Sequence, residues 1–353
     1  MGHDSAPESE NRDTLLEGGE VAFEGGRFEL KRKVLVTGAA GFIGSHVTEE
    51  LLKQGHTVLA LCKYSSSGSH GFLQNLVDEK LRVVLGDIRD AELVRSLCSE
   101  VDAVVNLAAL IGIPYSYTAP RSYLDTNLGG VLNLLEGIKN SDKSLVQIST
   151  SEVYGTPLTV PITLSHAINP QSPYAATKVA ADALCLSYAH SFGTKVSILR
   201  PFNTYGPRQS LRAIIPTILF QIHSGSKRIR IGNVKAKRDF TFIDDTVSGI
   251  TSAIDRLPGD GRIVQLGTGV TISIEELIHI CEDLFDVKLS LEVEKSRIRP
   301  KGSEVDVLQS DPSSAKENLN WSARVDLRDG LTRTMEWISS EGRNDKSVTS
   351  YFV

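Results

Sequence analysis

The most informative segment of the chain reads Lys33-Val34-Leu35-Val36-Thr37-Gly38-Ala39-Ala40-Gly41-Phe42-Ile43-Gly44. It joins a short apolar strand pattern, residues 33–37, to a helical pattern that runs from Phe42 to Gln54. Glycines at this spacing permit a tight turn, close approach of a pyrophosphate and close packing of helix on strand, while the helix N-terminus offers free N–H groups to phosphate charge. The segment therefore predicts a dinucleotide-binding loop with contacts from Gly38, Gly41, Phe42, Ile43 and Gly44.

The same strand–helix alternation continues outward from this segment. Apolar strand patterns at residues 56–61, 81–85, 103–107, 145–148 and 196–199 alternate with helical patterns at residues 92–99, 121–139 and 174–191. This alternation predicts the α/β class, with a doubly wound parallel sheet of the Rossmann type covered by helices on both faces. From Pro201 onward six prolines divide the chain into shorter elements, which predicts a smaller C-terminal substrate lobe.

We expect three parts in the chain. Residues 1–30 hold eight acidic and two basic residues and predict an acidic flexible tail. Residues 31–200 are expected to form the dinucleotide-binding domain, with residues 237–268 returning to it. The remainder of residues 201–353 is then a discontinuous lobe that binds the substrate.

The composition excludes several classes of protein. The 353 residues carry 38 Lys and Arg against 43 Asp and Glu, a net charge of −5, with no basic block that would bind nucleic acid or an anionic membrane. No apolar run approaches the roughly 18 residues of a membrane span, and the N-terminus lacks a signal-peptide pattern. Four widely spaced Cys and eight scattered His predict neither a metal site nor a disulfide framework. We therefore expect a cytoplasmic protein without metal, nucleic-acid or membrane partners.

The ends of the later strands predict the rest of the dinucleotide site. The second strand ends at Lys63 and runs into three serines, where an NAD site usually has an acidic residue. Lys63 and the serines favour NADP slightly over NAD, although a solvated loop lysine would look the same. Asp87 and Ile88 after the third strand are expected to face the adenine. After the fourth strand, Leu107, Ala108 and Ala109 are expected to line the path of the cofactor backbone.

A catalytic pattern follows the fifth strand. Ser149-Thr150-Ser151-Glu152-Val153-Tyr154-Gly155 comes directly after it, and Tyr174 and Lys178 lie four residues apart at the start of the next helix. Residues at this spacing share one helical face. A lysine ammonium beside a phenol favours the phenolate, so we expect Lys178 to lower the pKa of Tyr174. Tyr174 then acts as a base towards a sugar hydroxyl.

These motifs resemble those of the extended short-chain dehydrogenases/reductases, and within them the nucleotide-sugar 4,6-dehydratases. The likeness runs from about Lys31 to Trp337. It is closest to the UDP- or GDP-N-acetylglucosamine 4,6-dehydratases of the legionaminic-acid type. The segments that carry it are Ala108-Ala109-Leu110-Ile111-Gly112-Ile113-Pro114-Tyr115-Ser116-Tyr117, Gln171-Ser172-Pro173-Tyr174, Arg200-Pro201-Phe202-Asn203-Thr204-Tyr205-Gly206-Pro207-Arg208-Gln209-Ser210 and Arg299-Pro300-Lys301-Gly302-Ser303-Glu304-Val305.

The resemblance implies a carbon–oxygen lyase that holds NAD or NADP tightly and regenerates it in every turnover. Tyr174 takes the proton of O4 during transient oxidation at C4, Thr150 binds O4, and Lys178 holds the phenolate and the nicotinamide ribose. Glu152 removes the C5 proton before water leaves from C6. Glucose-nucleotide dehydratases carry Asp as the acid at the position of Ser151, so the resemblance leaves open which group protonates the leaving hydroxyl.

The resemblance also implies a substrate site and a homodimer. The nucleotide-sugar contacts are expected from Pro114, Tyr115, Asn203, Arg212, Arg238 and Arg299, with Tyr117 and Arg208 as further candidates. The two arginine forks of Arg238 and Arg299 suit a diphosphate. Residues 121–139 and 174–191 are expected to form a two-fold four-helix interface between subunits.

Other chemistries fit the same scaffold. A UDP-glucuronate decarboxylase also carries Thr-Ser-Glu here and needs only C4 oxidation before CO₂ is lost. A 4-epimerase has no need of a carboxylate at Glu152, and a 5,6-dehydratase, which would leave an exocyclic alkene, also remains open from the sequence. A non-catalytic, dinucleotide-sensing protein is disfavoured because Tyr174 and Lys178 are both present.

Overall fold

A seven-stranded parallel sheet organises the unit that starts at Lys31. The computed structural model describes residues 31–294 and 300–341. The strand order is β11-β6-β5-β4-β1-β2-β3, and every neighbouring pair is parallel. The strands are β1 (Lys33–Thr37), β2 (Thr57–Lys63), β3 (Leu81–Gly86), β4 (Ala103–Asn106), β5 (Ser144–Ile148), β6 (Lys195–Pro201) and β11 (Asp260–Leu266).

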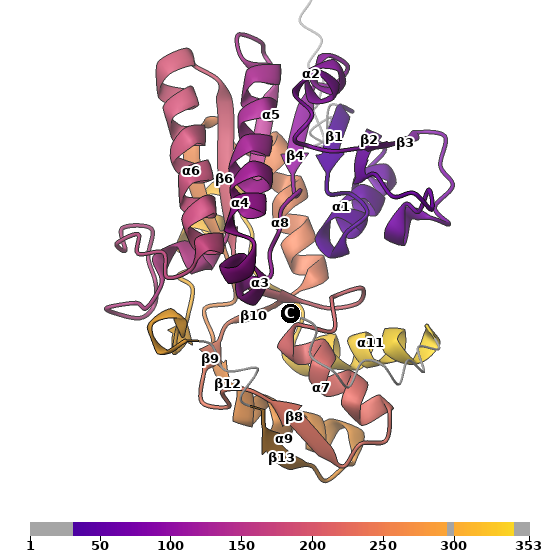
Figure 1. Cartoon of the computed structure of the whole chain (residues 1–353), viewed down its shortest axis with the longest axis vertical. Coiled ribbons are helices and arrows are strands. Elements are labelled where there is room, and N and C mark those ends of the chain that lie inside the picture. The colour runs from indigo at the N-terminus through magenta and orange to yellow at the C-terminus, as the bar shows by residue number, and fades with distance from the viewer. Residues whose placement is uncertain (1–30, 295–299, 342–353) are drawn as a thin grey trace, which may run out of the picture. The chain divides into compact units, whose positions relative to one another are not determined.

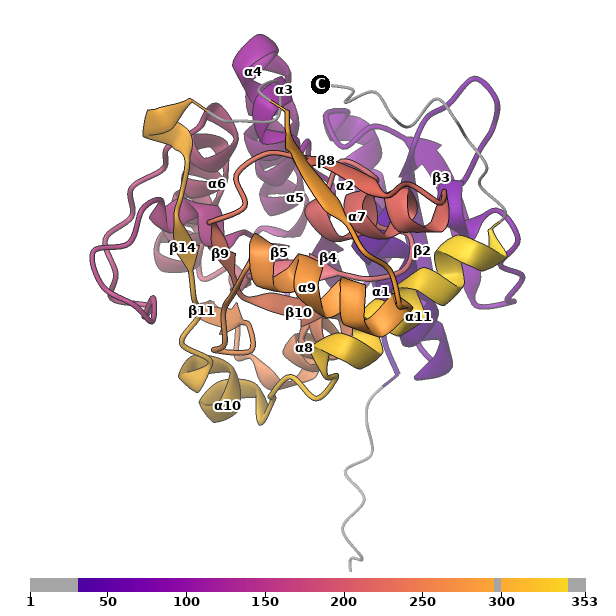
Figure 2. The same ribbon diagram turned by 90° about the horizontal axis from the view of Figure 1, so that it is seen from below.

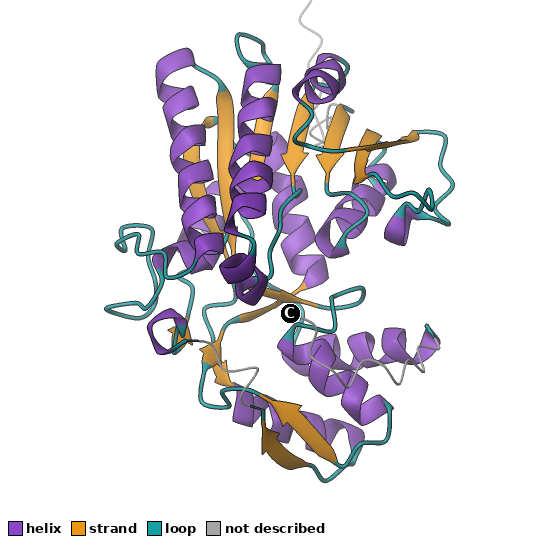
Figure 3. Cartoon of the chain, viewed as in Figure 1, coloured by secondary structure: helices purple, strands orange, loops and turns teal. Residues whose placement is uncertain are grey.

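Helices cover both faces of this sheet, as Figures 1 and 3 show. Alternate residues of a strand point to opposite faces, so Val34 and Val36 of β1 enter one apolar core and Leu35 enters the other. The first core packs against α1 (Phe42–Lys53) and α8 (Ile243–Arg256). The second packs against α2 (Ala91–Ser99), α5 (Gly130–Ile138) and α6 (Pro173–Phe192). The fold class predicted from the sequence is thereby confirmed.

One predicted helix differs in detail. Residues 121–139 form α4 (Pro120–Tyr123), a π-helical segment (Leu124–Gly129) and then α5. The wide turn contains the buried Asn127, whose side chain accepts from Leu110 N at 2.8 Å and donates to Leu110 O at 3.0 Å. The π-helical segment thus bonds the chain that follows β4 through the Asn127 side chain. Gly130 then lets α5 approach the segment that follows β3, because a Cβ there would stand 2.8 Å from the side chain of Ile88.

The chain after β6 builds the region below the sheet in Figure 1, seen from beneath in Figure 2. Its strands form three small sheets: β7 (Asn203–Tyr205) with β10 (Phe240–Phe242), β9 (Lys237–Arg238) with β12 (Ile272–Ser273) and β14 (Val307–Leu308), and β8 (Arg228–Ile231) with β13 (Ser290–Val293). Its helices are α7 (Ile214–His223), α9 (Ile274–Phe285), α10 (Ser313–Leu319) and α11 (Leu327–Ser340). Within it, α8 and β11 return to the parallel sheet. Among the described residues, every helix is too short or too polar to cross a membrane.

Candidate active site

The glycine loop between β1 and α1 forms a cradle of bare backbone. Gly38 has φ +67°, and a Cβ on it would stand 2.8 Å from Ala108 N. A Cβ on Gly44 would stand 2.2 Å from Gly38 O. No side chain caps the first turn of α1, so its N–H groups remain available to a phosphate. These features fit the pyrophosphate of a dinucleotide, held by the loop that the sequence predicted.

A chain of polar side chains links this loop to the neighbouring strand ends. Thr37 Oγ1 donates to Asn106 Oδ1 at 2.5 Å, and Asn106 Nδ2 donates to Gln147 Oε1 at 2.8 Å. Thr37 Oγ1 also accepts from Ala108 N at 3.2 Å, which fixes the predicted segment Leu107–Ala109 over the loop. Because all three side chains are buried, these bonds hold the carboxyl ends of β1, β4 and β5 in fixed relation.

The predicted adenosine end contains a carboxylate that is paired with an arginine. Asp87 is bound by Arg89 through two bonds, Nε to Oδ1 at 2.9 Å and Nη2 to Oδ2 at 2.6 Å. This pairing lowers the pKa of Asp87, and the nearby charge of Lys63 acts in the same direction. Lys63 is exposed, and its charge acts on the carboxylate of Asp87. A negative charge next to Lys63 disfavours the binding of a 2′-phosphate there. Ile88 is buried under Gly130.

Tyr174 lies at the first turn of α6 with its phenol almost fully buried. Burial raises the pKa of Tyr174 well above its ordinary value, and a hydrogen bond with Thr150 acts in the opposite direction. Tyr123 packs edge-on against it, with ring centroids 6.3 Å apart. The structure therefore joins Tyr174 to Thr150, the residue that the resemblance expects to bind O4.

The effect of Lys178 on the pKa of Tyr174 differs from the sequence prediction. Its Nζ donates to Ile148 O at 2.5 Å, and the influences on the Tyr174 pKa are led by burial rather than by this ammonium. The expected lowering of the Tyr174 pKa is therefore wrong, because burial raises it. Burial also lowers the pKa of Lys178 itself, opposed by the neighbouring Asp182.

Glu152 lies in a 3₁₀ turn, Ser151–Tyr154, that directly follows β5. Thr150 caps this turn by accepting from Glu152 N at 3.2 Å. The Glu152 side chain is half-buried, and its charge raises the pKa of Tyr174. Ser151 is buried beside it. The turn thus brings a carboxylate to the same site as the phenol.

Two buried residues near this site were not predicted from the sequence. Asn127 Nδ2 donates to Thr177 Oγ1 at 3.1 Å, which ties the π-helical segment to the helix of Tyr174. Asp182 lies one turn beyond Lys178 and accepts from Arg200 and Ser149. The four-residue spacing of Lys178 and Asp182 was the available signal for the second.

The substrate-side residues surround Tyr123. Tyr115 lies on α3 (Ile113–Thr118), of which Pro114 is the second residue. The ring centroid of Tyr115 is 6.1 Å from that of Tyr123. The positive charge of Arg212 acts on the Tyr123 hydroxyl. Tyr117 lies further along α3, and its OH bonds Ser303 Oγ at 2.5 Å. Aromatic rings and an exposed guanidinium therefore gather next to Tyr174.

Two of the remaining residues predicted to bind the substrate, Arg238 and Arg208, are bonded to other side chains of the protein. Arg238 is buried, faces Glu304 at 3.5 Å and donates to Lys237 O at 2.9 Å. Arg208 donates to Glu49 Oε1 at 2.8 Å and to Ser45 Oγ at 3.1 Å, so it holds α1 rather than standing free for a substrate. Asn203 begins β7, and its buried Oδ1 has no hydrogen-bond partner. Arg299 lies outside the described residues.

Comparison with known proteins identifies the family. The model of the family described as GDP-mannose 4,6 dehydratase matches residues 35–334. The chain belongs to this family. A UDP-glucuronate 4-epimerase from Thermodesulfobacterium geofontis is 35% identical, over 89% of this chain and 98% of that protein.

Solved structures of similar proteins agree with this assignment. UDP-glucuronic acid 4-epimerase from Bacillus cereus, in complex with UDP-glucuronic acid and NAD, superposes with a TM-score of 0.80 at 29% identity, covering 88% of this chain and 99% of that one. DesIV, a dTDP-glucose 4,6-dehydratase from Streptomyces venezuelae with NAD bound, has a TM-score of 0.77 at 30% identity, covering 90% and 99% of the two chains. This member of the GDP-mannose 4,6 dehydratase family is thus an extended short-chain dehydrogenase/reductase of the class that modifies nucleotide sugars.

These comparisons bear on two expectations from the sequence, the choice of cofactor and the type of reaction. The neighbours carry NAD, and nothing among them supports a preference for NADP. The relatives named above include UDP-glucuronate epimerases rather than N-acetylglucosamine dehydratases. The resemblance is therefore confirmed at the level of the family and class, and its finer part becomes a proposal.

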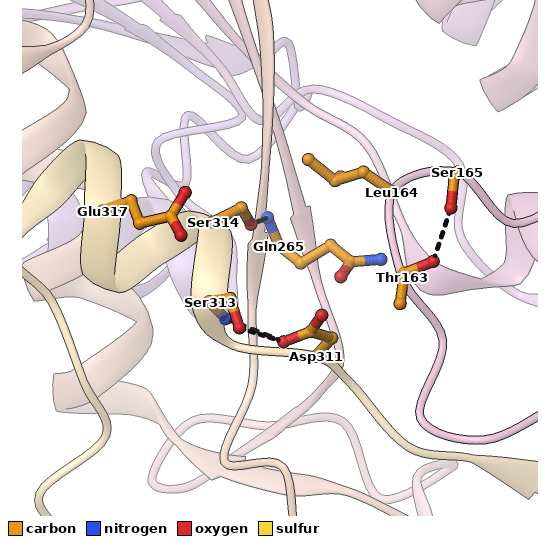
Figure 4. Close-up of a pocket in the computed structure, with 8 residues that line it drawn as sticks. All are labelled: Thr163, Leu164, Ser165, Gln265, Asp311, Ser313, Ser314 and Glu317. Carbon is orange, nitrogen blue, oxygen red and sulfur yellow. Dashed lines mark hydrogen bonds between the residues drawn. The ribbon is translucent and has the colours of Figure 1, made fainter.

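A separate pocket of this family member, about 300 Å³ in volume, lies beside β11 and α10. Figure 4 shows Gln265 between Thr163 and Ser165 on one side and Asp311, Ser313, Ser314 and Glu317 on the other. Its hydroxyls are bonded within the wall, Thr163 to Ser165 at 2.9 Å and Ser313 to Asp311 at 2.5 Å. The residues predicted for catalysis and for cofactor binding are all absent from its lining.

Proposed function

We propose that this protein is a 4,6-dehydratase of a UDP-linked hexose, with UDP-N-acetylglucosamine as the first substrate to test. The observation that carries the proposal is the carboxylate of Glu152 in the turn next to Tyr174. Oxidation at C4 alone needs only a phenol-type base, whereas loss of water across C5 and C6 needs a second base for the C5 proton. Glu152 supplies that second base.

The bound nicotinamide would take a hydride from C4 and return it to C6, which is the chemistry that the glycine loop and Lys178 would hold in place. We propose NAD as this cofactor, because the similar structures carry NAD and Lys63 lies near Asp87. The expectation of NADP is accordingly set aside.

The residues of the chain divide the proton transfers between them. Tyr174 accepts the O4 proton, and Thr150, already bonded to its hydroxyl, orients O4. The resulting 4-ketone acidifies the C5 proton, which passes to Glu152. The C6 hydroxyl would leave as water with the proton that Glu152 took from C5. C5 would then regain a proton from solvent as C6 gains the hydride removed from C4, and Tyr174 would release the O4 proton to solvent. The net change is the loss of one water from the sugar.

The presence of Ser151 raises the question of which group protonates the leaving C6 hydroxyl. Its side chain is buried next to Glu152, and a serine hydroxyl is too weak an acid to protonate a leaving group unaided. We propose that Glu152 carries the C5 proton to O6 itself. The diphosphate and the sugar would be held by Pro114, Tyr115, Asn203, Arg212, Arg238 and Arg299.

A second candidate function is 4-epimerisation of UDP-glucuronate. It is favoured by the similar proteins, among them the 35%-identical UDP-glucuronate 4-epimerase of Thermodesulfobacterium geofontis. These similar proteins support epimerisation more strongly than they support dehydration. An epimerase would use Tyr174, Thr150 and NAD in the same way and return the hydride to the other face of C4. Glu152 would then have no proton to move.

One incubation separates the two candidates. The full chain is mixed with NAD and either UDP-N-acetylglucosamine or UDP-glucuronate in deuterated water, and the products are analysed by mass spectrometry and chromatography. Loss of one water with deuterium at C5 supports dehydration. An unchanged mass together with conversion of UDP-glucuronate to its 4-epimer establishes the second function, and loss of CO₂ would indicate a decarboxylase.

We also propose a homodimer formed through α5 and α6. Leu124, Leu132 and Phe192 lie on this helical layer with 46%, 40% and 46% of their surface exposed. Exposed apolar side chains on two adjacent helices suit a four-helix interface with a second copy.

A further inference from the structure

A buried ion pair lies directly behind the proposed catalytic lysine. Asp182 is 3% exposed and Arg200 is 4% exposed. Asp182 Oδ2 accepts from Arg200 Nε at 3.1 Å, from Arg200 Nη2 at 2.9 Å and from Ser149 Oγ at 2.8 Å. Removing two charges from water is costly unless they are well paired. This carboxylate is held by two donors of Arg200 on β6 and by one from Ser149, the residue that follows β5.

The pair is also connected to the turn that carries Glu152. Arg200 Nη1 donates to Tyr154 OH at 2.9 Å, and Gln265 Nε2 donates to the same hydroxyl at 2.8 Å. Tyr154 is fully buried and ends the 3₁₀ turn. The network therefore fixes α6 and the Glu152 turn relative to one another through β6 and β11.

The second oxygen of Asp182 is the unusual feature. All the donors to Asp182 bind Oδ2, and Oδ1 is buried without a hydrogen-bond partner. A buried carboxylate oxygen without a donor is costly unless a positive charge compensates it. Lys178 lies one helical turn before Asp182 on α6, and residues four apart share a helical face.

We propose that Asp182 is a positioning residue for Lys178: its carboxylate, fixed by Arg200 and Ser149, keeps the buried ammonium charged and in place. This inference rests on the proposed function only in that Lys178 is taken to hold the ribose of the dinucleotide. Asp182 touches neither cofactor nor sugar in this scheme and acts through Lys178.

The electrostatics around Lys178 agree with this geometry. Burial lowers the pKa of Lys178, while Asp182 acts to raise it, followed by Cys185 one turn further along α6. Burial raises the pKa of Asp182, opposed by Arg200 of β6, by Ser149 just after β5 and by Lys178. Tyr174, on the preceding turn of α6, also senses the charge of Asp182. Replacing Asp182 by a neutral residue should therefore let Lys178 lose its proton at a lower pH.

The test is the affinity for NAD as a function of pH, measured by calorimetry on the full chain from about pH 6 to about pH 9. Asp182→Asn should weaken binding about tenfold relative to the unaltered protein at the alkaline end and change it little at the acidic end. Asp182→Glu retains the charge and should restore most of the alkaline affinity. A pH curve for Asp182→Asn that superimposes on that of the unaltered protein would overturn the proposal.

Asp245→Asn is a matched control. Asp245 is likewise buried, lies on α8 and accepts from Arg324 N at 3.0 Å and Val325 N at 2.9 Å. Because α8 packs on the other face of the sheet, this substitution should lower the melting temperature without moving the pH curve. If Asp182→Asn does not fold, the double variant Asp182→Asn/Arg200→Met removes both charges of the pair and should show the same alkaline loss.

The readout separates this inference from the proposed function. NAD binding does not depend on which sugar is turned over, so a protein that leaves every UDP-sugar unchanged still reports on Asp182. A failure of dehydration with an intact pH effect refutes the proposed function alone. An intact dehydratase whose Asp182→Asn variant keeps its alkaline NAD affinity refutes the role of Asp182 alone.

Discussion

Gly38 lies so close to Ala108 that a Cβ on the glycine would stand 2.8 Å from the alanine nitrogen. The loop after β1 and the loop after β4 are therefore in backbone contact where the pyrophosphate is expected. Gly38→Ala should abolish measurable NAD binding, because the alanine both displaces Ala108 and occupies φ +67°. The left-handed backbone alone should cost about 1–2 kcal/mol of unfolding free energy. Calorimetry with NAD and denaturant unfolding measure the two effects.

Gly68 provides the matched control for this substitution. It has the same φ of +67°, but a Cβ on it meets nothing within 4 Å. Gly68→Ala should therefore lose only the backbone part of the stability, about 1–2 kcal/mol, and retain NAD binding. Equal NAD affinity in the two variants would refute the role assigned to the glycine loop.

Tyr174 should give the reaction a dependence on pH. Its pKa is raised by burial, and only the deprotonated phenol accepts the O4 proton. Below that pKa the phenolate fraction grows as pH rises, so kcat/KM should increase with pH through the neutral range. Tyr174→Phe removes the base and should lower kcat at least about 100-fold while NAD still binds. A flat pH profile in the unaltered protein would contradict this assignment.

Glu152→Gln should separate oxidation from elimination. The amide keeps the size of the side chain and the capping bond from Glu152 N to Thr150, but it cannot take the C5 proton. Transient NADH, seen by its absorbance during a single turnover, should therefore still form while loss of water falls at least about 100-fold. If the variant dehydrates at the normal rate, Glu152 is not the base. If the protein is an epimerase, the variant should retain full epimerase activity.

The parts of the site that the sequence predicted are those set by local geometry. The glycine spacing between Gly38 and Gly44 and the four-residue spacing of Tyr174 and Lys178 both follow from the shape of one helix and its first turn. The apolar runs of the six predicted strands are explained by burial on both faces of the sheet. These features require no knowledge of distant partners.

The parts that it did not predict depend on long-range contacts. Arg238 meets Glu304, 66 residues away, and Gln265 meets Tyr154, 111 residues away. The helical pattern at residues 121–139 predicts one regular helix, whereas the structure has a π-helical segment there, Leu124–Gly129, whose Asn127 side chain bonds Leu110, 17 residues away. The pKa of Tyr174 is raised rather than lowered because the burial of its ring is the largest influence, and the charge of Glu152 acts in the same direction; burial cannot be seen in a four-residue spacing.

The proposed dimer gives the last prediction. Leu132 on α5 is 40% exposed, and at the centre of a four-helix interface an aspartate there would bury an unpaired charge. Leu132→Asp should therefore convert a dimer to a monomer at micromolar concentration, as measured by sedimentation velocity. Leu291→Asp is the control, because Leu291 is 42% exposed on β13, away from this helical layer, and should leave the assembly unchanged. A Leu132→Asp protein with the sedimentation coefficient of the unaltered protein would place the interface elsewhere, whereas loss of assembly in both variants would point to general destabilisation.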